Sequence, residues 1–485
     1  MQQASPLALQ ALALLEDAAS QGLVPADYQA GALRQALTRP GAVSPRVAKA
    51  LEASLVRYLS DLRQGRVDPA TLFNDQVLQA RPKPEPWNAR DFLDRHLAPG
   101  AAQSWDQAMA SAQPTGATYA QLKSALATYR ALAGHPAWAN PLPAPPNSGV
   151  QRLEDWPGMP QLLLRLRALG DLDADADALA VAADPSVLSH ALKGFQQRHG
   201  LQPDAVLGPL TWRALQVTPA QRARQILLNM ERQRWRPEAL ADRWLEVNLP
   251  EFTLRAMLRE GGGVQVQHAM AVVVGQASKH PTPRLLADLR QIELSPFWNV
   301  PYSIARDELL PQLRRTPALL AQAGYEFVFD SGQVQRQFST DALDAVLAGQ
   351  ARLRQRPGPA NAVGAIKFVM PNTKAIFLHH TPATQLFDLA RRDFSHGCIR
   401  VQDPVTLALF VLQGQPEANE QTLGESMKRD KPRWLTVVQP LPVLITYDTV
   451  RVEGGQLRFF DDIYQLDTAL DQALNRRPRP PLPAP

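Results

Sequence analysis

Residues 377–404 read FLHHTPATQLFDLARRDFSHGCIRVQDP and contain Cys398, the one cysteine among 485 residues. A single thiol cannot form an intramolecular disulfide, and it is too few for a thiolate zinc site. Two interpretations remain for it, a buried apolar side chain or a nucleophile. The residues around the thiol, in the string SHGCIR, favour the nucleophile.

A cysteine nucleophile needs a base or cation that holds it as a thiolate, and donors for the oxyanion that forms on attack. His379 follows the apolar run 375–378, so we expect it at the end of a strand, facing a thiol that the next turn presents. The amides of Gly397 and Cys398 are the expected oxyanion donors. Because His379, His396 and Cys398 are also zinc ligand types, a metal site stays open as an alternative, although no carboxylate or second cysteine completes a familiar spacing.

The stretch resembles the active-site signature of the L,D-transpeptidases, in which a histidine followed by Thr or Ser precedes a Ser-His/Ser-Gly-Cys-x-Arg string. The matched residues are His379, Thr381, Ser395, His396, Gly397, Cys398 and Arg400. Further segments, among them VNLPEFTL, SPFWNVPYSIA and LPVLITYDTV, look like the large Gram-negative members of that family. Together the similar segments cover most of residues 185–470.

The resemblance implies a thioester mechanism. Cys398 would attack the carbonyl between the third residue and D-alanine of a stem tetrapeptide, with His379 as its base and Gly397 at the oxyanion site. The residues expected to bind substrate or shape the site are Arg400, Ser395, His396, Thr381, Trp298 and Tyr302. Core packing is the alternative for Trp298 and Tyr302.

The implied partners are stem tetrapeptides as donor and acceptor, which would be joined by 3-3 cross-links, and carbapenems as covalent inhibitors. No cofactor and no metal are implied. The acceptor stays open between a second stem, a lipoprotein lysine, a free D-amino acid and water, and water would make the protein an L,D-carboxypeptidase. The rival classes are a catalytically inactive peptidoglycan-binding scaffold and a zinc protein.

A second resemblance lies upstream, where residues 192–215 read LKGFQQRHGLQPDAVLGPLTWRAL. This segment is similar to the small three-helix peptidoglycan-binding module. Leu188, Ala191, Leu192 and Phe195 are spaced as one buried helix face. Ala205 stands where that module usually has glycine, so the turn there is expected to differ.

The predicted fold class is a multidomain α+β protein whose β-rich L,D-transpeptidase catalytic domain carries a helical cap insertion. Ser5-Pro6 and Ser44-Pro45 mark helix starts near the N-terminus. The expected order is a helical scaffold (1–140), a proline-rich linker (141–150), the peptidoglycan-binding-like module (151–217), a connecting helix (218–243), the catalytic domain (244–450, cap about 304–360), a C-terminal strand and helix (451–476) and a disordered proline-rich tail (477–485).

The charge and the apolar content of the sequence limit which other classes of protein remain open. The 51 basic and 46 acidic residues are mostly interspersed, so the net charge of +5 does not indicate a nucleic-acid partner. No run approaches the roughly 20 apolar residues of a membrane helix. The opening MQQASPLALQALALL lacks an export signal, and we expect a periplasmic protein whose signal peptide has been removed.

Overall fold

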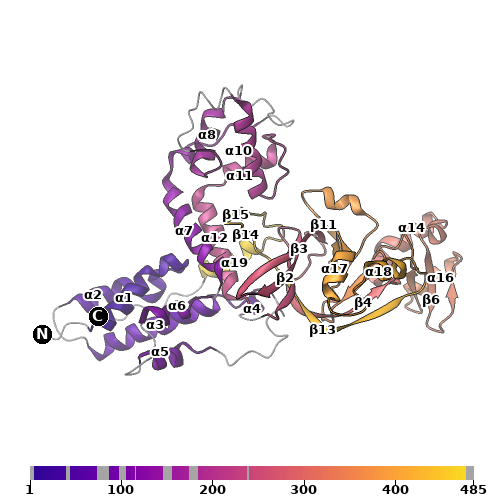
Figure 1. Cartoon of the computed structure of the whole chain (residues 1–485), viewed down its shortest axis with the longest axis horizontal. Coiled ribbons are helices and arrows are strands. Elements are labelled where there is room, and N and C mark those ends of the chain that lie inside the picture. Colours follow the sequence, from indigo (N-terminus) through magenta and orange to yellow (C-terminus); the bar gives the residue numbers. More distant parts are fainter. Residues whose placement is uncertain are drawn as a thin grey trace. The chain divides into compact units, whose positions relative to one another are not determined.

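The structure, a computed structural model, describes residues 5–39, 44–73, 87–97, 105–114, 116–145, 156–173, 184–237 and 240–476 (Figure 1). It divides into two compact units. Unit 1 comprises Met1–Glu238 and Asp448–Pro485, and unit 2 comprises Ala239–Tyr447. Residues 146–150 of the expected linker and the expected tail at 477–485 lie outside the described residues.

The N-terminal part of unit 1 is helical. Ser5 accepts a hydrogen bond from the Ala8 amide and Ser44 one from the Val47 amide, so both predicted helix starts are confirmed. The helices are α1 (Pro6–Glu16), α2 (Ala30–Thr38), α3 (Pro45–Gln64), α4 (Pro69–Phe73), α5 (Ala89–Leu97), α6 (Trp105–Ser111) and α7 (Ala117–Ala131), with 3-10 turns η1 (Asp17–Gln21), η2 (Pro25–Tyr28), η3 (Leu132–Gly134) and η4 (Pro136–Trp138).

Most residues of helix α12 (Pro219–Arg234) are buried inside unit 1. Its residues Ile226 and Met230 join the core of the N-terminal helices. Residues Val450 and Phe459 lie in the same core, although they come from the far end of the chain. They belong to a C-terminal segment that consists of hairpin β14 (Val450–Glu453) and β15 (Gln456–Phe459) and helix α19 (Leu466–Arg476).

The peptidoglycan-binding-like module contains α8 (Met159–Ala168), α10 (Pro185–Arg198) and α11 (Pro209–Gln216). Its core includes the predicted helix face Leu188, Ala191, Leu192 and Phe195. Buried Gln196 donates to Asp204 Oδ1 at 2.8 Å and accepts from the Ala205 amide at 2.9 Å. Ala205 has a φ of 62°, so the turn is left-handed even though alanine stands in the glycine position.

Ala205→Gly should stabilise unit 1, because glycine adopts a left-handed φ without the clash that the Cβ of alanine causes. We expect a gain of about 1 kcal/mol in the free energy of unfolding, measured by urea denaturation. The matched control, Ala214→Gly within α11, should lose about 1 kcal/mol. A less stable Ala205→Gly variant would show that this turn carries no strain.

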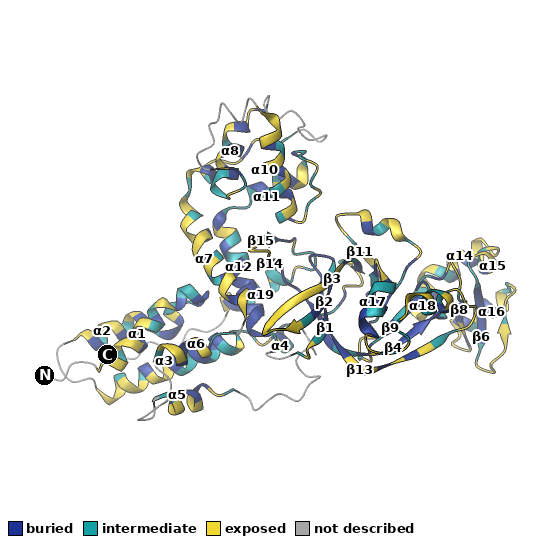
Figure 2. Ribbon diagram, viewed as in Figure 1, coloured by how far each residue is buried: buried dark blue, intermediate teal, exposed yellow. Residues whose placement is uncertain are grey.

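Unit 2 contains a nine-stranded sheet in the order β11-β3-β12-β10-β9-β4-β13-β1-β2. Its strands are β1 (Arg243–Asn248), β2 (Thr253–Glu260), β3 (Gly263–Gly275), β4 (Leu285–Leu294), β9 (Ile366–Val369), β10 (Leu378–His379), β11 (Asp393–Ser395), β12 (Ile399–Val401) and β13 (Arg433–Thr446). The start of β3, 263–269, is exposed, as Figure 2 shows, whereas most of its remainder is buried. Helices α17 (Pro404–Val411) and α18 (Glu420–Met427) complete the unit.

Register aligns two rows of side chains across five central strands. The Leu378 row is Leu435, Ile292, Phe368, Leu378 and Ile399, in the order β13-β4-β9-β10-β12, and every member is buried. The His379 row lies one residue along, and it consists of Trp434, Glu293, Lys367, His379 and Arg400. Because successive side chains in a strand point to opposite faces, the two rows lie on opposite faces of the sheet.

The segment expected to be a helical cap is a mixture of helices and strands. Its helices are α13 (Tyr302–Ile304), the π-helical turn η6 (Ala305–Leu309), α14 (Leu310–Arg315), α15 (Leu319–Gln322) and α16 (Thr340–Leu347), beside a sheet of β5 (Trp298–Asn299), β8 (Ala351–Gln355), β6 (Tyr325–Phe329) and β7 (Val334–Gln335). The expectation of a helical cap at about 304–360 is therefore only partly right, because its two main helical stretches, which begin at Leu310 and Thr340, both end early. Helix α14 ends before Thr316-Pro317, and Gly349, with a φ of 73°, follows the end of α16.

Candidate active site

Adjacent strands bring three of the predicted site residues, Cys398, His379 and Arg400, to one face of the sheet. β10 pairs in parallel with β12, and His379 stands opposite Arg400. Cys398 directly precedes β12, two residues before Arg400, so its side chain lies on the same face as Arg400 and His379. The thiol, the imidazole and the guanidinium therefore share one face of the sheet.

His379 is buried, with 5% of its surface exposed. Its Nδ1 lies 2.5 Å from the carbonyl oxygen of His380. Because a carbonyl oxygen only accepts, Nδ1 carries the proton and Nε2 is the basic nitrogen. Burial, followed by the charge of Arg400, lowers the pKa of His379 to about 3. The ring is therefore neutral near pH 7 and can accept a proton on Nε2.

The Cys398 thiol is half-buried, and its Sγ lies 3.8 Å from the carbonyl oxygen of Ala375. Burial raises the pKa of this thiol, while the Phe377 amide and the charges of Lys367 and Arg400 act in the opposite direction. This differs from the expectation of a resting thiolate. The thiol and the imidazole both rest in their neutral forms, because burial disfavours each charged form.

The turn before Cys398 is held by Ser395. The buried Ser395 hydroxyl donates to the Cys398 carbonyl at 2.6 Å and accepts from the Gly397 amide at 3.1 Å. The Gly397 amide is therefore bonded inside the turn, against the expectation that it serves the oxyanion. Among the described residues the Cys398 amide has no hydrogen-bond partner, so it is the better candidate donor.

Gly397 itself has a φ of 111°, a conformation that favours glycine. Its carbonyl accepts from the Thr282 hydroxyl at 2.7 Å, and that hydroxyl in turn accepts from the Gly275 amide at 2.8 Å. A Cβ on Gly275 would stand 3.0 Å from the Gly397 Cα. Gly275 and Thr282 thus fix the backbone that presents the thiol.

His396 links this turn to the segment at 304–360. Its Nε2 lies 2.7 Å from a carboxylate oxygen of Glu308, and its ring centroid is 4.9 Å from that of His280. His396 is exposed. The segment that contains Glu308 therefore lies directly beside the catalytic turn, where a cap would be placed.

The other predicted site residues are less directly placed. Arg400 is half-buried, and its Nε has no hydrogen-bond partner among the described residues. Thr381 is buried, and its hydroxyl accepts from the Ala383 amide. Trp298 packs on the core of the 304–360 segment, and the Tyr302 hydroxyl donates to the Leu347 carbonyl. No contact of Trp298 or Tyr302 with the Cys398 cluster is seen among the described residues.

Sequence reasoning missed several neighbours of the thiol. Lys367 stands opposite His379 in β9, with its Nζ 4.5 Å from the ring centroid of Phe377. Asn372 ties the loop beside the thiol by donating to the Ile376 carbonyl at 2.7 Å and accepting from the Ile376 amide. The alternation in the strand at 366–369 could have placed Lys367 on one face, but only the pairing with β10 shows which face that is.

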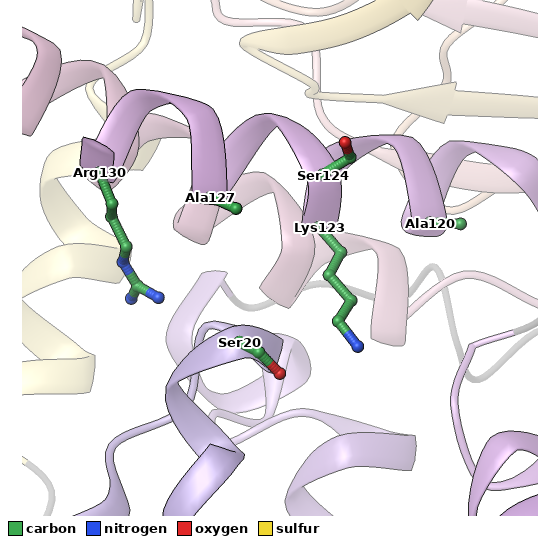
Figure 3. A pocket seen from close by; sticks show the side chains of 6 residues that line it. All are labelled: Ser20, Ala120, Lys123, Ser124, Ala127 and Arg130. Atoms are coloured by element: carbon green, nitrogen blue, oxygen red, sulfur yellow. The ribbon is translucent and has the colours of Figure 1, made fainter. Parts of the chain in front are cut away.

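Two further observations concern possible metal ligands and cavities. No group of three or more His, Cys, Asp or Glu side chains in the described part of the chain is placed to hold a metal ion. A cavity of about 310 Å³ in unit 1 is lined by Ser20, Ala120, Lys123, Ser124, Ala127 and Arg130 (Figure 3). Its lining offers no thiol or imidazole, so it does not compete with the Cys398 cluster as a nucleophilic centre.

Gly275→Ala should disturb the turn before Cys398. The new Cβ would lie 2.0 Å from the His280 carbonyl oxygen and 2.7 Å from the Thr282 amide nitrogen, and both of these are backbone atoms. We expect a loss of about 2 kcal/mol in unfolding free energy and slower alkylation of Cys398. Gly424→Ala in α18 is the matched control, with no atom within 4 Å of its Cβ. It should gain about 1 kcal/mol. An unchanged melting curve for Gly275→Ala would contradict the close approach.

The neutral thiol has a pH signature. Because burial raises the pKa of Cys398, iodoacetamide alkylation of the folded protein should keep rising above about pH 8.5, the ordinary thiol value. The urea-unfolded chain is the internal reference, since it carries the same single cysteine. His379→Ala should not move the alkylation midpoint upward, because the neutral ring contributes no charge. A rate plateau below pH 7 in the native protein would instead show a resting thiolate.

Comparison with known proteins identifies the domains of this chain. Three family descriptions match: an L,D-transpeptidase catalytic domain at 242–418, a "Scaffold domain" at 1–126 and a "Putative peptidoglycan binding domain" at 160–215. A protein of Haemophilus influenzae named "Putative L,D-transpeptidase" is 30% identical over 233 residues, which are 47% of this chain and 45% of that protein, so the match spans about half of each.

A solved structure, Bd1075 of Bdellovibrio bacteriovorus, matches with 13% identity over 49% of this chain and 58% of that chain, and the TM-score is 0.17. The catalytic-domain match at 242–418 includes Cys398, His379 and the strands that hold them. Residues 242–418 of the chain therefore match an L,D-transpeptidase catalytic domain, and residues 160–215 match a peptidoglycan-binding domain.

Proposed function

We propose that this protein forms 3-3 cross-links between peptidoglycan stem peptides through a thioester on Cys398, with release of D-alanine. The observation that carries the proposal is the placement of a half-buried thiol and a neutral, carbonyl-oriented imidazole on one face of the sheet. The peptidoglycan-binding match at 160–215 supports a cell-wall substrate.

In the first half-reaction the Cys398 sulfur attacks the carbonyl carbon of the third stem residue, and its proton passes to Nε2 of His379. Since both groups start neutral, this transfer accompanies the attack and creates charge only where the oxyanion forms. The Cys398 amide donates to that oxyanion. The peptide C–N bond then breaks, and the imidazolium returns the proton to the amine of the departing D-alanine.

In the second half-reaction an amine of the acceptor stem attacks the thioester carbonyl. The neutral His379 takes the proton of the attacking amine and passes it to the leaving sulfur, so thiol and imidazole return to their starting forms. Water in place of the amine gives a shortened stem and the same regenerated enzyme. The side-chain cations Arg400 and Lys367 lie on the same face and suit the carboxylates of a stem peptide.

Other residues act by positioning. Ser395 and Thr381 are buried and bonded within their own loops, so we assign them to the shape of the turn. His396 connects the turn to Glu308 in the cap. Gly397 allows the left-handed backbone that Cys398 follows.

We place the protein in the periplasm, because its proposed substrate lies outside the cytoplasmic membrane. Of the helices in the described ranges, none combines the length and the hydrophobicity that crossing a membrane demands. Acylation of Cys398 by carbapenems follows from the same nucleophile and belongs to this proposal.

The test is incubation with a purified disaccharide tetrapeptide, followed by intact-mass analysis of the protein and product analysis. The native protein should gain the mass of the acyl group, and Cys398→Ala should show none, with turnover reduced about a thousandfold or more. Dimers that lack one D-alanine are the expected product. An acyl adduct that persists in Cys398→Ala would end the assignment of the nucleophile, and shortened stems alone would show a carboxypeptidase.

A further inference from the structure

The His379 row extends from the thiol cluster to an exposed tryptophan. Going outward from Arg400, the row continues through His379, Lys367 and Glu293 to Trp434. Trp434 is 51% exposed, and no ring or cation lies against it among the described contacts. A large aromatic side chain is thus presented on the same face of the sheet as the nucleophile.

A second row on that face forms an open floor beside the first. Thr436 pairs with Gln291, and Gln291 pairs with Val369. Thr436 and Gln291 are exposed and Val369 is half-buried. Phe377, also half-buried, directly precedes β10, and its backbone amide lies next to the Cys398 thiol. The floor therefore runs without a buried residue from β13 to the thiol.

The two rows together form a strip that runs from Cys398 to Trp434. This strip has two chemical features besides the tryptophan. Lys367 Nζ lies over the Phe377 ring and 3.7 Å from a Glu293 carboxylate oxygen. Lys367 is half-buried and Glu293 is buried, so the ammonium is the charged group nearer to solvent. An ammonium beside the thiol suits a carboxylate on the bound peptide. The flat, apolar face of an exposed indole suits the C–H face of a sugar ring.

Trp434 and Thr436 could also be exposed because a peptide backbone pairs with the edge of β13, but the contacts of β13 argue against this explanation. The Gln415 side chain donates to the Thr436 carbonyl at 2.9 Å and accepts from the Val438 amide at 3.0 Å. These backbone groups of β13 are already bonded. The strip thus offers side chains to a ligand that lies across the strands.

The length of the strip matches a donor stem and its sugar. Trp434 and Arg400 are four strand spacings apart, which is about 19 Å at about 4.8 Å per strand. Three extended residues, up to the scissile carbonyl, span about 10 Å. The remaining distance accommodates the linker to the sugar and the sugar ring.

We propose that the strip from Cys398 to Trp434 is the donor subsite, in which Lys367 binds a carboxylate of the stem and Trp434 stacks on the sugar that carries it. This inference rests on the proposed function, because it names where the donor of that reaction lies. It makes the enzyme select a stem that is still attached to glycan.

The experiment compares two donors, a disaccharide tetrapeptide and the free tetrapeptide. In turnover, Trp434→Ala should lower kcat/KM for the disaccharide tetrapeptide about tenfold and leave the free tetrapeptide unchanged, whereas Trp434→Phe should retain most of the preference. Lys367→Met should weaken both donors, since both carry the carboxylate. Val438→Ala, on the same strand but outside both rows, is the matched control and should affect neither donor appreciably.

Binding gives a readout that does not need turnover. In a Cys398→Ala background, Trp434→Ala should raise the Kd of the disaccharide tetrapeptide about tenfold and leave that of the free tetrapeptide unchanged. The donor subsite would be overturned if Trp434→Ala weakened the binding of both donors equally, or if protein that retains Trp434 bound both donors with equal affinity. Neither result would contradict acyl transfer by Cys398. An absent acyl adduct in the native protein, with the sugar-dependent binding intact, would instead remove the proposed reaction and leave a binding surface.

Discussion

The parallel pairing of β10 with β12 is the constraint on which the site depends. These strands are short, yet one register places Leu378 and Ile399 in the buried row and His379 and Arg400 in the other. A slip of one residue would exchange the two faces and bury the guanidinium among aliphatic side chains. The apolar row therefore sets the geometry of the reacting groups, because its burial fixes which way each strand faces.

Burial also sets the protonation states of Cys398 and His379. It raises the pKa of the Cys398 thiol and lowers that of the His379 imidazole, so neither group is charged while the site waits for substrate. The nearby cations act on the thiol in the opposite direction but do not reverse the shift. A neutral pair avoids the cost of keeping two partly desolvated ions. In the proposed reaction, the Cys398 amide and the neighbouring cations would stabilise the charge that develops during attack.

Much of this site could be predicted from the residues alone. The uniqueness of Cys398 and the spacing of the surrounding motif predict the nucleophile, and serine–proline pairs predict helix starts that the structure confirms. Lys367 and Trp434 could not be assigned, because their position relative to the thiol depends on the order β12-β10-β9-β4-β13, which local pattern does not reveal. The strands at 325–329 and 351–355 could not be predicted, because helix-forming residues surround them in the sequence. Their pairing with each other decides their structure.

The course of the chain through the two units bears on the order in which they can form. Unit 2 is one continuous segment, whereas unit 1 takes Val450 and Phe459 into a core that is otherwise made of residues before 239. Because the chain emerges from its N-terminus, whether from the ribosome or from an export channel, unit 2 can emerge whole and fold while unit 1 still lacks β14, β15 and α19. The core of unit 1 is completed only when the last part of the chain arrives, so a chain cut short before residue 450 would hold all of unit 2 and an incomplete unit 1.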